Sequence, residues 1–196
     1  MKKYVLLAWV LLGIISVADA AEQFVKFDKA SAENALLLTG TKDTIRYSPS
    51  DWEGVKMAVA NLRHDFHSVT GSECAPVLVA TVGKSELAKI YSKQSKQLKG
   101  KWEQYLIFTD KGKLVILGSD KRGTIYGIYE LFRQIGVSPW YWMADAPIAH
   151  HDQLYVLPGT YTDGEPKVKY RGIFINDEWR TMERPLGEHH DHSKTP

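Results

Sequence analysis

The sequence has 196 residues, which suits a single domain with an ordinary core and excludes a large multidomain enzyme. It holds 25 Lys and Arg against 23 Asp and Glu, a formal net charge of +2, and 44% of its residues are hydrophobic. This composition excludes disorder, collagen and coiled coil, and without a basic block nucleic acid is not expected as a partner. The single cysteine, Cys74, excludes an intrachain disulfide.

The N-terminal segment has the pattern of a secretory signal peptide. Lys2 and Lys3 precede an apolar run over residues 4–17, and Ala18-Asp19-Ala20 has the small-x-small pattern of a cleavage site. We therefore expect residues 1–20 to be removed and the mature chain to be secreted or periplasmic, without membrane contact. A membrane anchor is the alternative, but the apolar run is shorter than the roughly 18 residues that a spanning helix needs.

The first half of the mature chain predicts two strands and a long helix. The strands are expected at residues 23–27 and 44–47. Ser50 with Glu53 three residues later forms a candidate capping box, and the helix would end at Gly71. Apolar residues recur at steps of three and four along this helix and predict its buried face: Trp52, Val55, Val59, Leu62, Phe66 and Val69.

The second half continues to alternate between strands and helices. A buried strand is expected at 76–82, a short helix at 85–91 and a polar loop at 92–101. The segments 105–109 and 114–117 are expected to form a hairpin around Asp110-Lys111-Gly112-Lys113. A helix at 122–135, ended by Gly136, and strands at 154–157 and 170–175 complete the predicted elements. The fold class predicted from this order is α/β (α+β-like), a small mixed sheet with helices packed on it.

A glycine-rich loop lies between the second strand of the hairpin and the helix that follows. Gly118 and Gly123 have the spacing of a phosphate loop, but Thr124 stands where that motif needs lysine, so nucleotide binding is not predicted. Lys121 and Arg122 at the start of the helix form a candidate site for a carboxylate or phosphate, with a solvated basic turn as the alternative. Gly123 and Gly127 share one helix face and would let the helix approach the sheet closely.

The histidines do not indicate a metal centre. His150-His151-Asp152 and His189-His190-Asp191-His192 lack the spacing of ligands on a helix, and the second group lies in a polar tail. No metal or other cofactor is therefore expected. Serine, histidine and aspartate are all present, but no G-x-S-x-G nucleophile elbow accompanies them.

The aromatic cluster Trp140-Tyr141-Trp142 follows a Gly-Val-Ser-Pro turn. Such rings stack on sugars, and equally they fill the contact between a domain and its neighbour. Both interpretations stay open at this point.

Three motifs together resemble a known family. They are Gly118–Leu131, Gln134–Asp145 and Lys169–Glu178, and the likeness extends over about residues 24–178. These motifs are similar to the opening of glycoside hydrolase family 115. The resemblance implies removal of glucuronic acid, or its 4-O-methyl ether, from xylan side chains. It also implies an N-terminal α/β domain, resembling the second domain of hexosaminidases, in front of a catalytic (β/α)8 barrel.

The sequence departs from the family after the third motif. The resemblance makes Asn176, Asp177 and Glu178 candidate substrate-binding residues on the first barrel strand, and Asp177 the candidate substrate-contacting carboxylate. A barrel needs roughly 250 residues, and the sequence ends at Pro196, so no catalytic residue is assigned. The expected division is a signal peptide (1–20), an α/β domain (21–165), an orphan first strand of the missing barrel (166–178) and a polar tail (179–196).

Two functions follow as hypotheses. The first is an N-terminal fragment of a secreted α-glucuronidase-like hydrolase that is inactive alone, its full-length relative acting on acidic xylan or xylo-oligosaccharides. The alternative is a non-catalytic domain, either purely structural or binding acidic xylan through Lys121, Arg122, Trp140 and Trp142.

Overall fold

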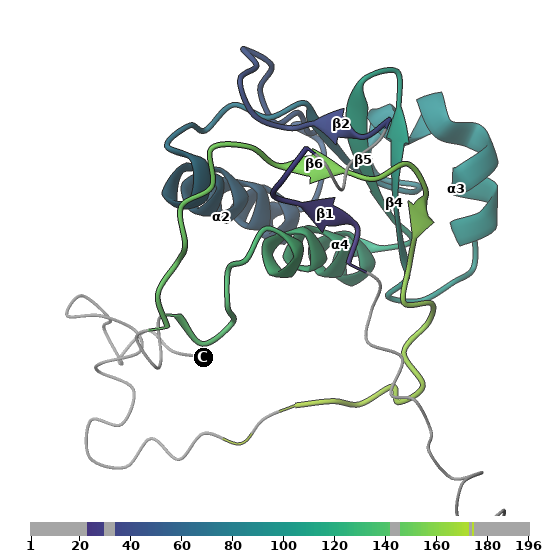
Figure 1. Ribbon diagram of the computed structural model, residues 1–196. Helices are drawn as coiled ribbons and strands as arrows, with labels where there is room; N and C mark the ends of the chain where they lie inside the picture. The colour runs from purple at the N-terminus through teal and green to yellow at the C-terminus, as the bar shows by residue number, and fades with distance from the viewer. Residues whose placement is uncertain (1–22, 30–33, 142–145, 173, 175–196) are drawn as a thin grey trace, which may run out of the picture.

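The computed structural model describes residues 23–29, 34–141, 146–172 and 174 (Figure 1). The strands are β1 (Val25–Lys26), β2 (Leu36–Leu37), β3 (Val77–Thr81), β4 (Tyr105–Asp110), β5 (Lys113–Gly118), β6 (Tyr155–Val156) and β7 (Thr160–Tyr161). The helices are α2 (Glu53–Thr70), the 3-10 helix η1 (Glu86–Tyr91), α3 (Ser92–Leu98) and α4 (Lys121–Gln134). The predicted fold class, α/β with a small mixed sheet and helices packed on it, is confirmed, and the structure divides the strands between two sheets.

The main sheet has the strand order β3-β5-β4-β7. β3 and β5 are parallel, with Thr81 opposite Gly118 at their carboxyl ends, whereas β4 is antiparallel to both β5 and β7. The hairpin predicted between β4 and β5 is present, and Lys111 and Gly112 in its turn both have positive φ. Because β3 and β5 run the same way, the loops that follow them leave from one edge of the sheet.

The central strands are buried on both faces. Alternate residues of β3, β4 and β5 point to opposite sides, as the period of two in a strand requires. One side packs against α2 and α4 and contributes Val77, Val79, Tyr105, Ile107, Leu114 and Ile116. The other packs against η1 and α3 and contributes Leu78, Ala80, Leu106, Phe108, Val115 and Leu117. Figure 1 shows α2 and α4 as neighbours and α3 on the far side of the sheet.

Helix α2 has the buried face that the sequence predicts, but its first turn differs. Val55, Val59, Leu62, Phe66 and Val69 are each fully buried, and Gly71 ends the helix in the left-handed conformation with φ 74°. The predicted capping box at Ser50 is wrong, and the helix begins later.

The residue at the N-cap position is Trp52, and no side chain caps the helix. The hydroxyl groups of Ser50 and Ser48 instead bond each other at 2.8 Å. Trp52 is therefore not part of the buried helical face, and 45% of it is exposed.

Helix α4 lies unusually close to the sheet because of its glycines. Asp120 is its N-cap and accepts a hydrogen bond from the backbone N–H of Gly123 at 2.8 Å. A Cβ at Gly123 would lie 2.4 Å from the backbone oxygen of Gln104, and one at Gly127 would lie 2.8 Å from Cγ2 of Ile116. The close approach predicted from the glycine spacing is confirmed.

The polar segment at 92–101, expected as a loop, contains helix α3 instead. Its sequence SKQSKQL has one buried residue, Leu98, so no apolar stripe marks it. It continues directly from η1, and the hydroxyl of Ser95 donates to the carbonyl of Ala88 at 2.8 Å. Packing of Leu98 with Tyr91 and Ala88 against the sheet stabilises a helix that its polar sequence did not predict.

A second, small sheet has the order β1-β6-β2 and joins the two ends of the domain. Val25 and Leu36 are both paired with Val156, so distant parts of the sequence meet here. The buried side chain of Gln134, at the end of α4, accepts a hydrogen bond from the backbone N–H of Phe24 at 3.0 Å. This contact ties β1 to α4.

Two of the predicted strands are not strands in the structure. Residues 44–47 form isolated bridges, with Thr44 opposite Cys74 and Arg46 opposite Leu78, because only alternate residues reach β3 and the segment before it. At 170–175, residues 170–172 and 174 have no strand structure, and none of the described strands pairs with them. Residues 173 and 175 lie outside the described part.

Among the helices of the described ranges, none has the length and hydropathy needed to cross a bilayer. The predicted signal peptide, residues 1–20, lies outside the described residues.

Candidate functional site

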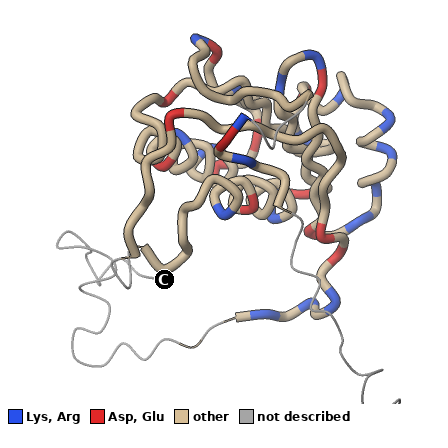
Figure 2. The backbone as a smooth tube through the Cα atoms, in the orientation of Figure 1, with Lys and Arg blue, Asp and Glu red and all other residues tan. Residues whose placement is uncertain are grey.

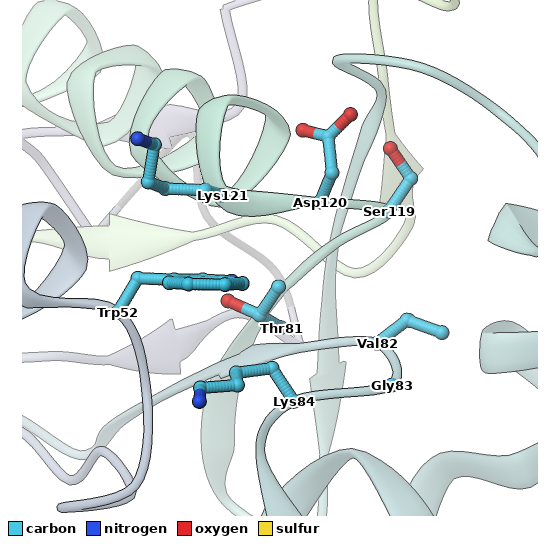
Figure 3. Close-up of a pocket in the computed structure, with 8 residues that line it drawn as sticks. All are labelled: Trp52, Thr81, Val82, Gly83, Lys84, Ser119, Asp120 and Lys121. Carbon is cyan, nitrogen blue, oxygen red and sulfur yellow. The ribbon is translucent and has the colours of Figure 1, made fainter.

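The loops that follow β3 and β5 meet at the carboxyl edge of the main sheet and border an open cavity of about 360 Å³. The cavity is lined by Trp52, Thr81, Val82, Gly83, Lys84, Ser119, Asp120 and Lys121 (Figure 3). An edge where two parallel strands end next to a helix N-terminus is a common place for ligands in α/β proteins. We take this cavity as the candidate functional site.

A buried polar network fixes the floor of the cavity. Asp51, which is 4% exposed, accepts hydrogen bonds from the Thr81 hydroxyl at 2.7 Å, the Thr81 N–H at 3.1 Å and the Trp52 N–H at 2.8 Å. The Thr81 hydroxyl also lies 2.8 Å from that of Thr124 on α4. With three donors, the Asp51 carboxylate is satisfied and serves to position Trp52 over β3.

The carboxylate of Asp120 is occupied as well. One oxygen accepts the N–H of Gly123 and the other accepts the N–H of Glu103, each at 2.8 Å. Asp120 therefore caps α4 and holds the loop before β4, instead of offering a free acid to a ligand.

The cations at the cavity are Lys84 and Lys121. The ammonium of Lys84 lies 4.6 Å from the centroid of the Trp52 ring, a cation–π contact. In Figure 3 the ring is seen edge-on between the side chains of Lys121 and Lys84. The predicted anion site at the start of α4 thus has Lys121 at the cavity, together with two residues that the sequence analysis did not assign to a site, Trp52 and Lys84.

Arg122, the second predicted cation, is engaged elsewhere. Its guanidinium forms an ion pair with Glu103 at 3.0 Å and donates to the hydroxyl of Tyr126 at 2.9 Å. Glu103 is 8% exposed at its side chain and also pairs with Arg171 from the C-terminal segment. Arg171 in turn donates to the Tyr126 hydroxyl at 3.2 Å and lies over the ring of Trp102.

Three further hydrogen bonds hold the segment after β7 against the start of β4 and the loop before it. Glu165 accepts from the ammonium of Lys101 at 2.8 Å and from the backbone N–H of Trp102 at 3.0 Å. The hydroxyl of Tyr105 donates to Asp163 at 2.6 Å. Burial, together with this hydrogen bond, raises the pKa of Tyr105 well above its ordinary value.

The structure does not bring Trp140 to the predicted cations. Trp140 is 61% exposed and follows the C-terminal end of α4, whereas Lys121 and Arg122 lie at the opposite end of this 14-residue helix, which is about 20 Å long. Tyr141, its neighbour, packs against the main core. Trp142, Asn176, Asp177 and Glu178 lie outside the described residues.

The described ranges contain no group of three or more His, Cys, Asp or Glu side chains that could hold a metal ion. His150 lies 3.2 Å from Asp152, and both side chains are exposed. The second histidine cluster, 189–192, lies outside the described residues.

Comparison with known proteins first defines the class. Residues 52–131, which hold α2, β3, the hairpin and most of α4, match the family described as glycosyl hydrolase family 67 N-terminus. No curated protein sequence matches the chain. The domain is therefore of the kind found at the N-terminus of certain glycoside hydrolases.

Comparison with solved structures shows which glycoside hydrolases this chain is similar to. BtGH115A, described as a family GH115 4-O-methyl-α-glucuronidase with specificity for decorated arabinogalactans, is 34% identical with a TM-score of 0.65, and the match covers 73% of this chain and 20% of that one. A Flavobacterium johnsoniae chitobiase has 15% identity and a TM-score of 0.45, covering 79% and 21% of the two chains. The chain is a GH115 α-glucuronidase-like N-terminal region and spans about a fifth of BtGH115A, which confirms the resemblance found in the three motifs.

Proposed function

We propose that this chain is the N-terminal α/β region of a secreted α-glucuronidase-like glycoside hydrolase that removes (4-O-methyl)glucuronic acid from polysaccharide side chains. The supporting observation is the 34% identity to BtGH115A over 73% of the chain. The resemblance of the three motifs to family 115 implies xylan as the polysaccharide. Decorated arabinogalactan is the other candidate, because BtGH115A is described as specific for it.

We further propose that the 196 residues alone do not cleave a glycosidic bond. Most glycoside hydrolases use two carboxylates, one as acid and one as base or nucleophile, fixed roughly 5–10 Å apart across the bond. At the candidate site the two carboxylates are Asp51 and Asp120, and backbone N–H groups and a hydroxyl occupy both. Neither is available to donate or accept a proton at a substrate.

The activity is tested by incubating the purified chain with 4-O-methylglucuronoxylan and, separately, with uronate-bearing arabinogalactan. We expect no release of glucuronic acid from either polymer. Release that follows the purified chain through a sizing column would overturn the proposal. Export is tested by sequencing the N-terminus of the protein recovered outside the cytoplasm, which should begin at Ala21.

The second candidate function is non-catalytic binding to the same acidic glycans. The observation that favours it is the cavity at the edge of the main sheet, which joins an exposed tryptophan to lysines. Pull-down of the chain by insoluble glucuronoxylan would support binding. If the chain stays in solution with every acidic glycan tested, a purely supporting role for the domain is the better description.

A further inference from the structure

The loop after β3 separates two hollows that belong to one groove. The first is the cavity of about 360 Å³ beside Trp52, and the second, of about 630 Å³, lies over η1 and α3. Val82, Gly83 and Lys84 line both. The groove therefore runs from the N-terminus of α4 across this loop to α3.

The groove carries more positive than negative side chains. Its lining includes Lys84, Lys89, Lys96 and Lys121, against the two carboxylates of Asp120 and Glu86. Asp120 is already bound by two backbone N–H groups, which leaves Glu86 as the acidic side chain of the lining without such partners. Figure 2 shows the basic character of α3, whose sequence has lysines and no acidic residue. Such a surface attracts an anionic ligand.

Trp52 gives the groove an aromatic surface. Trp52 is 45% exposed, and the hydrogen bond from its backbone N–H to buried Asp51 holds its backbone at the cavity. Flat indole rings pack on the apolar face of a pyranose ring, and the Lys84 ammonium, which here lies over the Trp52 ring, would move off it to pair with a carboxylate on that sugar. The Trp52 ring and the Lys84 ammonium, 4.6 Å apart, correspond to two features of a uronic acid, the apolar face of its sugar ring and its carboxylate.

A buried hydroxyl in the groove wall points to the same kind of ligand. Within the described residues, Ser85 Oγ is the buried side-chain polar atom without a hydrogen-bond partner, and the residue is 4% exposed. Ser85 lies at the N-cap of η1, yet its side chain makes no cap bond. Buried polar groups are nearly always satisfied, so a hydroxyl-rich ligand or its bound water would supply the missing partner.

We propose that this groove binds a uronic-acid-bearing glycan, with the uronic acid on Trp52 and its carboxylate at Lys84 and Lys121. The choice of a uronic acid rests on the proposed function, whereas the groove and its charge do not. The site lies at the opposite end of α4 from Trp140, so it is distinct from the aromatic cluster predicted from the sequence.

Affinity electrophoresis of the full chain tests the proposal, with 4-O-methylglucuronoxylan in the gel and the same polymer after carboxyl reduction as the second probe. We expect retardation by the acidic polymer, and binding weaker by about tenfold after reduction. Trp52→Ala and Lys84→Gln should each weaken binding to the acidic polymer by about fivefold to tenfold. Lys111→Gln removes the same charge at the opposite edge of the sheet, in the hairpin turn, and should leave binding unchanged.

The outcomes separate this proposal from the proposed function. Equal retardation by the acidic and the reduced polymer would overturn the role of the carboxylate. Unchanged binding in both groove variants, with circular dichroism showing that they fold, would overturn the site. Either result leaves the absence of cleavage by this chain intact, and release of glucuronic acid would overturn the proposed function whatever the groove binds.

Discussion

The close packing of α4 on the sheet can be tested with three glycine-to-alanine substitutions that share one chemical change. In each, alanine gains up to about 1 kcal/mol from its higher helix propensity and the lower entropy of the unfolded chain. The steric cost differs. A Cβ at Gly54 meets Cδ1 of Ile125 at 3.4 Å, an ordinary contact, whereas one at Gly127 meets the Ile116 side chain at 2.8 Å. At Gly123 it meets the backbone oxygen of Gln104 at 2.4 Å.

These distances predict a graded series. Gly54→Ala should stabilise the protein by about 0.4–1 kcal/mol, since nothing has to move. Gly127→Ala should be destabilising by about 1 kcal/mol, because Cγ2 of buried Ile116 at 2.8 Å and Cβ of Tyr105 at 3.1 Å must both give way. Gly123→Ala should lose about 2 kcal/mol or more, because α4 and the backbone before β4 must separate at a cost of about 1–3 kcal/mol and sometimes more.

Urea and thermal unfolding followed by circular dichroism measure the series. For a chain of this length, about 2 kcal/mol lowers the melting temperature by roughly 4–8 °C. Gly54→Ala is the matched control, because it has the same substitution on the neighbouring helix. A Gly123→Ala protein as stable as the Gly54→Ala protein would refute the close approach of α4 to Gln104.

Three other predictions concern the core and the C-terminal segment. Leu62 is fully buried on α2, so Leu62→Ala should cost about 2–5 kcal/mol in urea unfolding, and a loss under about 0.5 kcal/mol would contradict its burial. Burial and the bond to Asp163 raise the pKa of Tyr105, so its contribution to stability is complete below pH about 10 and declines as the pH rises further. Tyr105→Phe should reduce this alkaline decline between about pH 10 and about pH 11.5, and an equal decline in both proteins would count against it. Glu103→Gln should speed amide hydrogen exchange in residues 167–171, because it removes the anion that holds Arg171; unchanged exchange would show that the segment is held otherwise.

The sequence predicts the elements that leave a regular pattern of apolar residues or a characteristic glycine spacing. The fully buried face of α2, the hairpin and the glycines of α4 all leave a periodic or spacing signal, and each is present in the structure. Helix α3 leaves none, because one buried leucine in seven residues does not define a face. Trp52 fits the helical period of α2 by position alone, yet it precedes the helix and lies in the cavity.

The sequence predicts one part of the candidate site, the loop after β5, but not Trp52 and Lys84, because tertiary contacts bring these residues to the site. The loop after β5 was recognised from its glycines and cations, which are local signals. Trp52 and Lys84 are 32 residues apart in the sequence and meet because β3 ends beside β5. The sequence predicts two strands that each lead into a helix, and in the structure these strands are parallel, so the loops that follow them share an edge of the sheet. This topology places Lys84, in the loop after β3, at the same edge as the glycine-rich loop after β5.

The two ion pairs of the C-terminal segment, Lys101–Glu165 and Arg171–Glu103, differ in how strongly they can hold this segment to the domain. Lys101 and Glu165 are 47% and 29% exposed at their side chains, and an ion pair so accessible to water contributes little to stability. Glu103 is 8% exposed and lies between two guanidinium groups, so removing its charge would leave Arg122 and Arg171 facing each other without a counterion. Hydrogen bonding to Lys101 lowers the pKa of Glu165, so its contact is lost as the pH falls through that lowered value. We therefore expect Glu103, not Glu165, to anchor residues 167–171. Glu165→Gln should leave hydrogen exchange in that segment near the wild-type rate while Glu103→Gln raises it, and equal rates in the two variants would assign the anchor to neither carboxylate.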